Sequence, residues 1–228
     1  MGVKENLGRA RKRILESAGI SNSDGVVLVG ATKGVPLECI TEAIDAGLTD
    51  VGENSVQEAE AKFPHLPHIR KHFIGHLQGN KAKKAVSLFD MIQSVDSYKI
   101  AGKISESAAV SGKTMPVLIE VRTDENKKFG ILPGDLADFV ANVSDFKGIR
   151  IMGLMTVGPY FENPEDSRAV FREMKRLFDS IKKENIPNVE MRHLSMGMSP
   201  DFTIAIEEGS YMVRIGKGIF GERADRER

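Results

Sequence analysis

The sequence predicts an α/β fold, a single (β/α)8 TIM-type barrel, and three features support this prediction. Short β-branched apolar runs alternate with helical stretches, which is typical of parallel strands joined by crossover helices. The apolar runs number about eight, the number of strands that closes such a barrel. No proline-rich or glycine-serine tract divides the 228 residues, so we expect residues 1–228 to form one domain.

The expected elements follow one another in strict order after an opening helix over residues 4–18. The expected strands cover residues 26–31, 49–52, 71–75, 91–94, 115–121, 149–156, 189–194 and 212–215. The helical patterns between them cover residues 37–46, 57–63, 80–88, 99–110, 135–143, 167–183 and 201–207. In such barrels the reactive groups lie at the carboxyl ends of the strands, so polar residues at those ends define the candidate site.

The composition gives no sign of a nucleic-acid partner or of an anionic membrane surface, because 32 basic residues balance 32 acidic ones. The single cysteine, Cys39, cannot form an intrachain disulfide, and the charged segment 1–13 does not resemble a signal peptide. No apolar stretch is long enough to cross a bilayer. We therefore expect a cytoplasmic protein in which Cys39 packs on a buried helix face beside Ile40 and Ala43.

Lys33 directly follows the first expected strand, which places an amine at the barrel mouth above an apolar run. Burial at this position would lower the pKa of the amine, and a lysine that forms a Schiff base must lose its proton. Lysines after strands are more often solvated, so Lys33 alone does not decide the function.

The segment after the seventh expected strand has the features of a phosphate site. Ser195, Gly197 and Ser199 precede Pro200 and Asp201, where a helix should begin. A helix N-terminus offers free backbone N–H groups and a positive dipole end, and TIM barrels often bind phosphate after strands seven and eight. The same residues would equally suit a Ser/Asp helix cap.

Two further patterns concern strand residues. In the eighth expected strand, Arg214 alternates with Val213 and Ile215, so it should point into the barrel mouth, where it needs a partner. His68, His72 and His76 recur every fourth residue, a spacing that metal ligands on a helix could have. Because residues 69–75 look like a strand, which scatters the ring nitrogens, we expect no metal site here.

Taken together, the sequence resembles the pyridoxal phosphate homeostasis protein family, which is related in architecture to the N-terminal domain of alanine racemase. The resemblance covers nearly the whole chain. It rests on the segments Thr32-Lys33, Gly52-Glu53-Asn54, Val56-Gln57-Glu58, residues 72–81, Gly153-Leu154-Met155, residues 194–199, residues 212–216 and Ile219-Phe220-Gly221.

The resemblance implies a pyridoxal 5'-phosphate cofactor held as an internal aldimine on Lys33. It also implies that Arg214 faces the pyridine nitrogen and that Gly216 contacts the phosphate through its N–H. The implied phosphate loop is Ser195, Gly197, Met198 and Ser199, and the implied pocket walls are Asn54 and Met155. Two departures are Thr32 in place of a common serine, and Lys217 where a small hydroxyl residue is frequent, which removes a hydroxyl contact to phosphate.

An arginine beside the pyridine nitrogen disfavours ring protonation and weakens the cofactor as an electron sink. The related racemases also use a tyrosine from a partner domain, and of Tyr98, Tyr160 and Tyr211 only Tyr160 lies beyond a strand end, in an expected surface loop. We therefore expect a monomeric carrier that supplies pyridoxal phosphate to apoenzymes, without substantial turnover. The alternatives are an amino-acid racemase, a weak transaminase and a Schiff-base aldolase acting on sugar phosphates.

Overall fold

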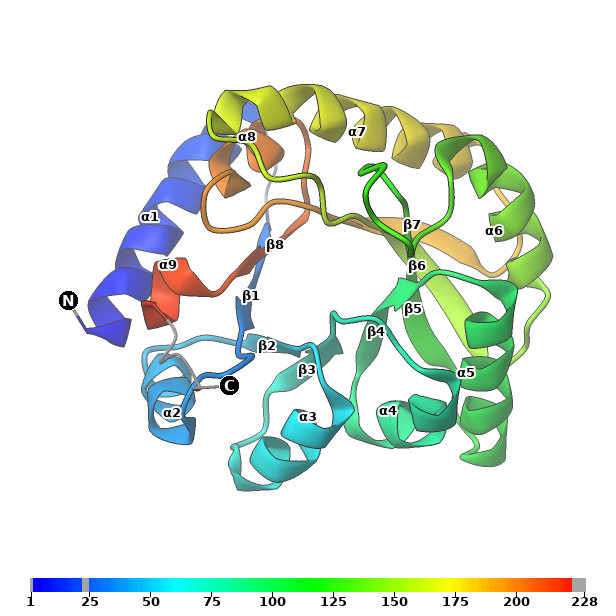
Figure 1. The fold of residues 1–228 in the computed structure, drawn as a ribbon, viewed down its shortest axis with the longest axis horizontal. Coiled ribbons are helices and arrows are strands. Elements are labelled where there is room, and N and C mark those ends of the chain that lie inside the picture. Colours follow the sequence, from blue (N-terminus) through cyan, green and yellow to red (C-terminus); the bar gives the residue numbers. More distant parts are fainter. Residues whose placement is uncertain (1, 22–24, 223–228) are drawn as a thin grey trace.

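The computed structural model describes residues 2–21 and 25–222, and within them eight parallel strands close into a barrel in sequence order. The strands are β1 (Val27–Ala31), β2 (Asp50–Glu53), β3 (Arg70–Phe73), β4 (Met91–Val95), β5 (Met115–Glu120), β6 (Ile149–Met155), β7 (Val189–Ser195) and β8 (Met212–Ile215). Figure 1 shows the ring of strands with the helices around it. The predicted (β/α)8 barrel is confirmed.

The helices occupy the positions that the sequence predicts between the strands. They are α1 (Val3–Ser21), α2 (Leu37–Asp45), α3 (Val56–Lys62), α4 (Ala82–Leu88), α5 (Tyr98–Val110), α6 (Leu136–Ser144), α7 (Arg168–Lys183), α8 (Phe202–Glu207) and α9 (Lys217–Phe220). Serine N-caps start two of them: Ser55 accepts from the N–H of Glu58 in α3, and Ser97 accepts from the N–H of Ile100 in α5. The short helix α9 was not predicted.

The third strand ends two residues earlier than expected. It stops at Phe73, and Gly75 then passes against the backbone of Asn54, where any Cβ atom would collide with main-chain atoms. The predicted helix over residues 80–88 is also shorter, because a 3₁₀ turn (Gly79–Lys81) precedes α4. The close approach of Gly75 to Asn54 joins segments about 20 residues apart, which the local pattern does not contain.

Two apolar layers form the core. The larger layer lies between the strands and the surrounding helices, and α7 contributes Phe171, Met174 and Phe178 to it at helical spacing. A smaller buried cluster combines side chains from strands across the barrel: Val29, Met91, Leu118, Met155 and Met212. The barrel interior is therefore filled by side chains, as in other barrels of eight strands.

The closure of the barrel brings the two ends of the sequence together. Val29 of β1 pairs with Arg214 of β8, and Ser195 of β7 pairs with Met212 of β8. Helix α1 packs against α8 and α9 (Figure 1), and the Asn6 amide donates to the carbonyl of Ile219. The first strand and the last two strands thus present their carboxyl ends side by side.

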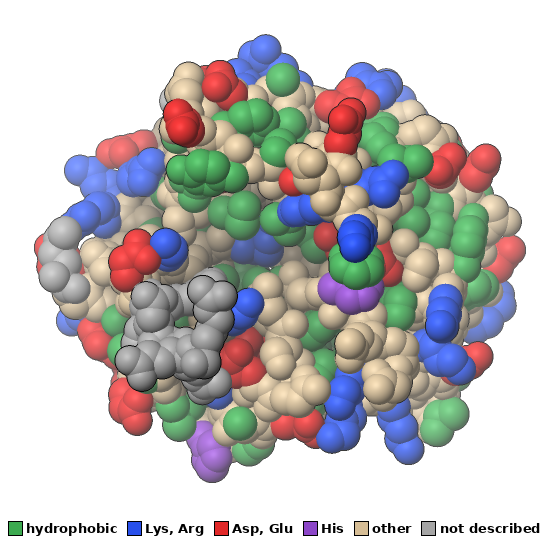
Figure 2. Space-filling model, viewed as in Figure 1, with side chains coloured by type: hydrophobic (Ala, Val, Ile, Leu, Met, Phe, Trp, Pro, Cys, Tyr) green, Lys and Arg blue, Asp and Glu red, His purple; other side chains and the backbone are tan. Residues whose placement is uncertain are grey.

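Within residues 2–21 and 25–222, no helix combines the length and the apolar character that spanning a membrane requires. Acidic and basic side chains are intermixed over the face shown in Figure 2.

Candidate cofactor site at the carboxyl ends of the strands

Lys33 occupies a tight turn directly after β1. The N–H of Val35 donates to the carbonyl of Thr32 at 3.0 Å, so Lys33 and Gly34 are the two central residues. Gly34 has a φ of +70°, as the third position of a type II turn requires. The turn begins at the mouth of the barrel, where the sequence placed Lys33.

Lys33 takes the solvated position that is more common for lysines after strands, and not the buried one. Its side chain is exposed, and no described residue forms a hydrogen bond or an ion pair with it. The physical reason is that Lys33 lies two residues past the last residue of β1, so the apolar run of the strand ends before it and does not cover the amine. The amine is therefore accessible to a ligand at the mouth.

Arg214 lies inside the barrel with its side chain almost fully buried, as the alternation along β8 predicts. Its guanidinium donates at 2.6 Å to the hydroxyl oxygen of Ser195 and at 2.6 Å to the carbonyl of Thr156. Burial lowers the pKa of Arg214 to about 10, and the nearby carboxylates of Glu120 and Asp201 partly offset this effect. Arg214 therefore stays a cation at neutral pH, held by partners from two other parts of the barrel.

A chain of hydrogen bonds continues from Arg214 through the barrel interior. Ser195 donates to Gln93 Oε1 at 2.7 Å, and Gln93 Nε2 lies 3.0 Å from His72 Nδ1. His72 Nε2 lies 2.9 Å from Asp50 Oδ1. With Gln93 Nε2 as a donor, His72 Nδ1 must accept, which leaves the proton on Nε2 facing Asp50.

This chain changes the role expected for Ser195. Its hydroxyl accepts from Arg214 and donates to Gln93, so it fixes the arginine and is not directed at a phosphate. Gln93 and Thr156 were not predicted as site residues, and His72 was considered only as a metal ligand. Two adjacent polar residues, Gln93 and Ser94, inside the short apolar run of β4 are the signal that could have found Gln93.

The loop after β7 and the turn after β8 are joined to each other. The N–H of Gly218 donates to Ser199 Oγ at 3.1 Å, and the N–H of Met198 donates to Asp201 Oδ1 at 2.6 Å. Asp201 directly precedes α8, but its carboxylate forms no capping hydrogen bond to that helix, so the Ser/Asp helix cap is not formed at Asp201. The N–H groups of Ser199 and Gly216 have no hydrogen-bond partner among the described residues, so they can receive an anion.

Gly197 is required by the backbone of this loop. Its φ is +91°, and a Cβ atom there would lie 2.6 Å from Ala205 Cβ in α8. We expect Gly197→Ala to lower the free energy of unfolding by about 1–3 kcal/mol in chemical denaturation, because strain and overlap add. In the matched control Gly8→Ala, on the exposed face of α1 with no neighbour near the new Cβ, stability should rise slightly. Equal effects of the two substitutions would contradict the requirement for glycine at position 197.

The remaining predicted site residues fall into three environments. Asn54 is exposed directly after β2, and Met155 is fully buried in the inner apolar cluster at the end of β6. Gly216 sits beside β1, because a Cβ atom on it would lie 3.3 Å from the carbonyl oxygen of Ala31. Lys217 is exposed and pairs with Glu222 at 2.8 Å. Met155 thus lies below the mouth, whereas Asn54 lies at its rim.

Two charged residues that no sequence motif indicated, Glu120 and Lys127, lie near Arg214. Glu120 ends β5, and burial raises the pKa of its carboxyl group, with repulsion from Asp96 acting in the same direction. Burial lowers the pKa of Lys127, which donates to the carbonyl of Val157 at 2.5 Å and is attracted to Glu120. Glu120 is the last residue of β5 and Lys127 follows the strand, and no sequence motif marked this strand end.

The histidines do not converge on one point. His72 contacts Asp50 inside the barrel, whereas His76 lies 2.9 Å from Asp96 and stacks on Phe129 with ring centroids 3.5 Å apart. The expectation that the strand scatters the ring nitrogens is confirmed.

Cys39 is partly buried and packs against the core cluster that includes Ile40 and Ala43, as predicted.

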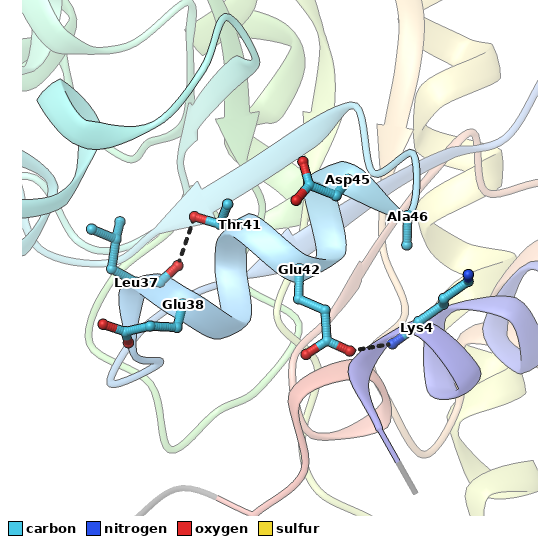
Figure 3. Close-up of a pocket in the computed structure, with 7 residues that line it drawn as sticks. All are labelled: Lys4, Leu37, Glu38, Thr41, Glu42, Asp45 and Ala46. Atoms are coloured by element: carbon cyan, nitrogen blue, oxygen red, sulfur yellow. Dashed lines mark hydrogen bonds between the residues drawn. The ribbon is translucent and has the colours of Figure 1, made fainter.

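A groove of about 530 Å³ lies away from these residues, between α2 and the start of α1. Figure 3 shows the carboxylates of Glu38, Glu42 and Asp45 along it, with Glu42 accepting from the N–H of Lys4. None of the predicted site residues lines this groove. The candidate site is therefore at the strand ends and not in this groove.

Comparisons with known proteins agree with this architecture. The family model for the alanine racemase N-terminal domain matches residues 4–224. A pyridoxal phosphate homeostasis protein of Aquifex aeolicus is 41% identical, with 98% of this chain and 99% of the relative covered. The protein of the same name from Escherichia coli K12 is 34% identical, with 97% of each covered.

This chain belongs to the pyridoxal phosphate homeostasis protein family. Among solved structures, PipY of Synechococcus elongatus PCC7942 with bound pyridoxal phosphate has a TM-score of 0.85 and 32% identity, over 96% of this chain and 100% of PipY. An alanine racemase of Clostridium difficile has a TM-score of 0.72 at 14% identity, over 97% of this chain and 58% of the racemase. The likeness to the racemase shows a shared barrel fold.

Proposed function

We propose that this chain is a carrier that binds pyridoxal phosphate reversibly through the amine of Lys33 and thereby limits the free aldehyde. One observation carries the proposal: three kinds of group lie at the adjacent carboxyl ends of β1, β7 and β8. They are the accessible amine of Lys33, the buried guanidinium of Arg214 and the two N–H groups, of Ser199 and Gly216, that have no partner among the described residues. The names of the similar proteins and the bound cofactor in PipY support the same ligand.

The residues fit this cofactor in chemistry as well as in place. When bound, pyridoxal phosphate supplies an aldehyde that condenses with a primary amine. Lys33 provides that amine, while the N–H groups of Ser199 and Gly216 would hold the phosphate. Ser195, Gly197 and Met198 would shape the loop, and Asn54 and Met155 would border the ring.

Arg214 favours binding over carbanion chemistry. A permanent cation near the ring nitrogen disfavours its protonation, and electron withdrawal by the ring then weakens. The structure holds Arg214 in place through Ser195 and Thr156, so the cation cannot easily move away from the interior. We therefore propose little catalytic turnover.

The tyrosines of the chain also favour a carrier over a racemase. Tyr160 is 84% exposed, which confirms its expected surface position. Tyr211 packs against Phe178, and Tyr98 packs against Phe139 in the outer layer. Tyr98 nevertheless starts α5, just beyond the carboxyl end of β4, so the expectation that only Tyr160 lies beyond a strand end is wrong.

The first test is borohydride trapping on the purified protein. We expect a yellow protein with a visible absorbance band that disappears on reduction, and one modified lysine, Lys33, in the peptide map. An adduct on a different lysine would refute the assignment of Lys33. A protein with no such band after incubation with pyridoxal phosphate would favour a Schiff-base aldolase without this cofactor.

The second test measures turnover. The loaded protein is incubated with L-alanine or L-serine in deuterated water, and α-deuteration is followed by mass spectrometry. We expect no deuteration at an enzyme-like rate. Rapid deuteration would identify a racemase or transaminase instead.

We further propose that the protein is a monomer that acts in the cytoplasm and delivers the cofactor to apoenzymes, without a nucleic-acid or membrane partner.

A further inference from the structure

Hydrogen bonds hold the turn that contains Lys33 on both sides of the lysine. On one side, Thr32 is fully buried, and its hydroxyl lies 2.9 Å from Glu53 Oε1 and 3.1 Å from the carbonyl of Gly52. On the other side, the N–H of Gly34 donates to Glu58 Oε1 at 2.6 Å. Both neighbours of Lys33 are thus tied to carboxylates from the next strand and helix.

Lys62 joins these two carboxylates to the turn. Its ammonium donates to the carbonyl of Thr32 at 2.7 Å, to Glu53 at 2.8 Å and to Glu58 at 2.6 Å. A lysine ammonium has three donors, and all three are used here. The side chain of Lys62 is only 13% exposed and that of Glu53 is fully buried, whereas Glu58 is partly exposed, so the cluster of Glu53, Glu58 and Lys62 lies mostly behind the turn.

The energetics of this cluster indicate a role beyond stability. Burial raises the pKa of Glu53, against the effect of Lys62, which shows that desolvation is a large cost at this position. Buried ion pairs often stabilise a fold no more than apolar side chains of similar volume would. What the cluster does supply is a fixed backbone on either side of Lys33, while the Lys33 side chain stays exposed.

We propose that Glu53, Glu58 and Lys62 are positioning residues that hold the Thr32–Gly34 turn so that the Lys33 amine meets the aldehyde of a cofactor anchored by its phosphate. This inference rests on the proposed function. A fixed turn removes the cost of ordering the amine at each binding event, which raises affinity without a new contact to the ligand.

Glu58→Ala is the variant that tests this role. Glu58 is partly exposed, and its removal leaves Glu53 and Lys62 as a balanced pair. We expect the variant to fold and to bind pyridoxal phosphate with a dissociation constant at least about tenfold higher, and to condense with it more slowly. Pyridoxine phosphate, which has the phosphate but no aldehyde, should bind the variant and the natural protein equally.

Two further variants serve as controls. Glu58→Gln keeps an oxygen that can accept from the N–H of Gly34, so it should recover most of the affinity. Glu60→Ala, on the same helix, removes a side chain that pairs with Lys84 away from the turn, and it should bind both ligands normally. If Glu58→Ala does not fold, Thr32→Val tests the cluster from the other side of Lys33, because it removes the hydroxyl bond from Thr32 to Glu53 at nearly constant volume.

The outcomes separate this inference from the proposed function. Natural protein that forms no visible band overturns both. A natural protein that binds normally, together with unchanged binding by Glu58→Ala or by its Thr32→Val substitute, overturns the positioning role alone. Equal weakening of pyridoxal phosphate and pyridoxine phosphate also overturns it, because the cluster would then act on the whole site.

Discussion

Lys33→Ala should abolish the visible absorbance band of the loaded protein and the borohydride-trapped adduct. Lys33 supplies the amine in the turn after β1, and no described residue occupies it in another contact. The proposed phosphate contacts, the N–H groups of Ser199 and Gly216, do not involve this side chain, so the variant should still bind pyridoxine phosphate. Absorbance titration and mass spectrometry of the reduced protein measure the two effects.

Lys147→Ala is the matched control for this substitution. Lys147 is an exposed lysine between α6 and β6, at the opposite end of the barrel from the mouth, and it should keep the natural spectrum. A band that persists unchanged in Lys33→Ala would show that a different amine holds the cofactor. The assignment of Lys33, and the positioning role of its turn, would then both fail.

Arg214→Glu should lower the free energy of unfolding by about 3–5 kcal/mol, the range for removal of one partner from a buried charged network. The guanidinium donates to Ser195 and to the carbonyl of Thr156 inside the barrel. A glutamate would place a carboxylate against that carbonyl and would remove the cation that acts on Glu120 and Asp201. Urea denaturation of the two proteins at neutral pH measures the loss.

The control for charge reversal is Lys12→Glu, on the exposed face of α1, where a change of less than about 0.5 kcal/mol is expected. A similar small change in Arg214→Glu would contradict the buried network.

Arg214→Gln addresses the function, because it removes the charge and keeps an amide donor for Ser195. We expect a shifted absorbance spectrum of the bound cofactor; an unchanged spectrum would mean that Arg214 does not face the ring nitrogen.

Local patterns were sufficient for the order and number of the strands. Periodicity and turn residues act over a few positions, so strand β8 was predicted with its observed bounds and the other strands within about two residues of theirs. The predicted bounds are wrong where a segment from elsewhere in the chain packs against the strand. The third strand stops at Phe73 because Gly75 passes against Asn54, and α9 forms in a tail whose glycines suggested no helix.

The candidate site was predictable only in part. Lys33, Ser199, Arg214 and Gly216 do lie near the carboxyl ends of β1, β7 and β8, and their contacts to a cofactor stay predictions. The sequence left open whether Lys33 is buried, and it did not show that Arg214 and Gln93 engage the hydroxyl of Ser195. Gln93 was missed because its partner Ser195 is 102 residues away along the chain. Glu58 and Lys62 were missed as neighbours of Lys33 for the same reason, since α3 reaches the turn only in the folded barrel.

The sequence by itself determined the alternation of strands and helices, and with it the end of the barrel at which polar residues gather, because these depend on side-chain pattern over short windows. The tertiary structure decided which of those residues touch. Barrel closure sets β8 beside β1, the interior joins Arg214 to Ser195 and Gln93, and packing of α3 fastens the turn of Lys33. Contacts between residues far apart in the chain depend on the geometry of the closed sheet, which no local pattern specifies.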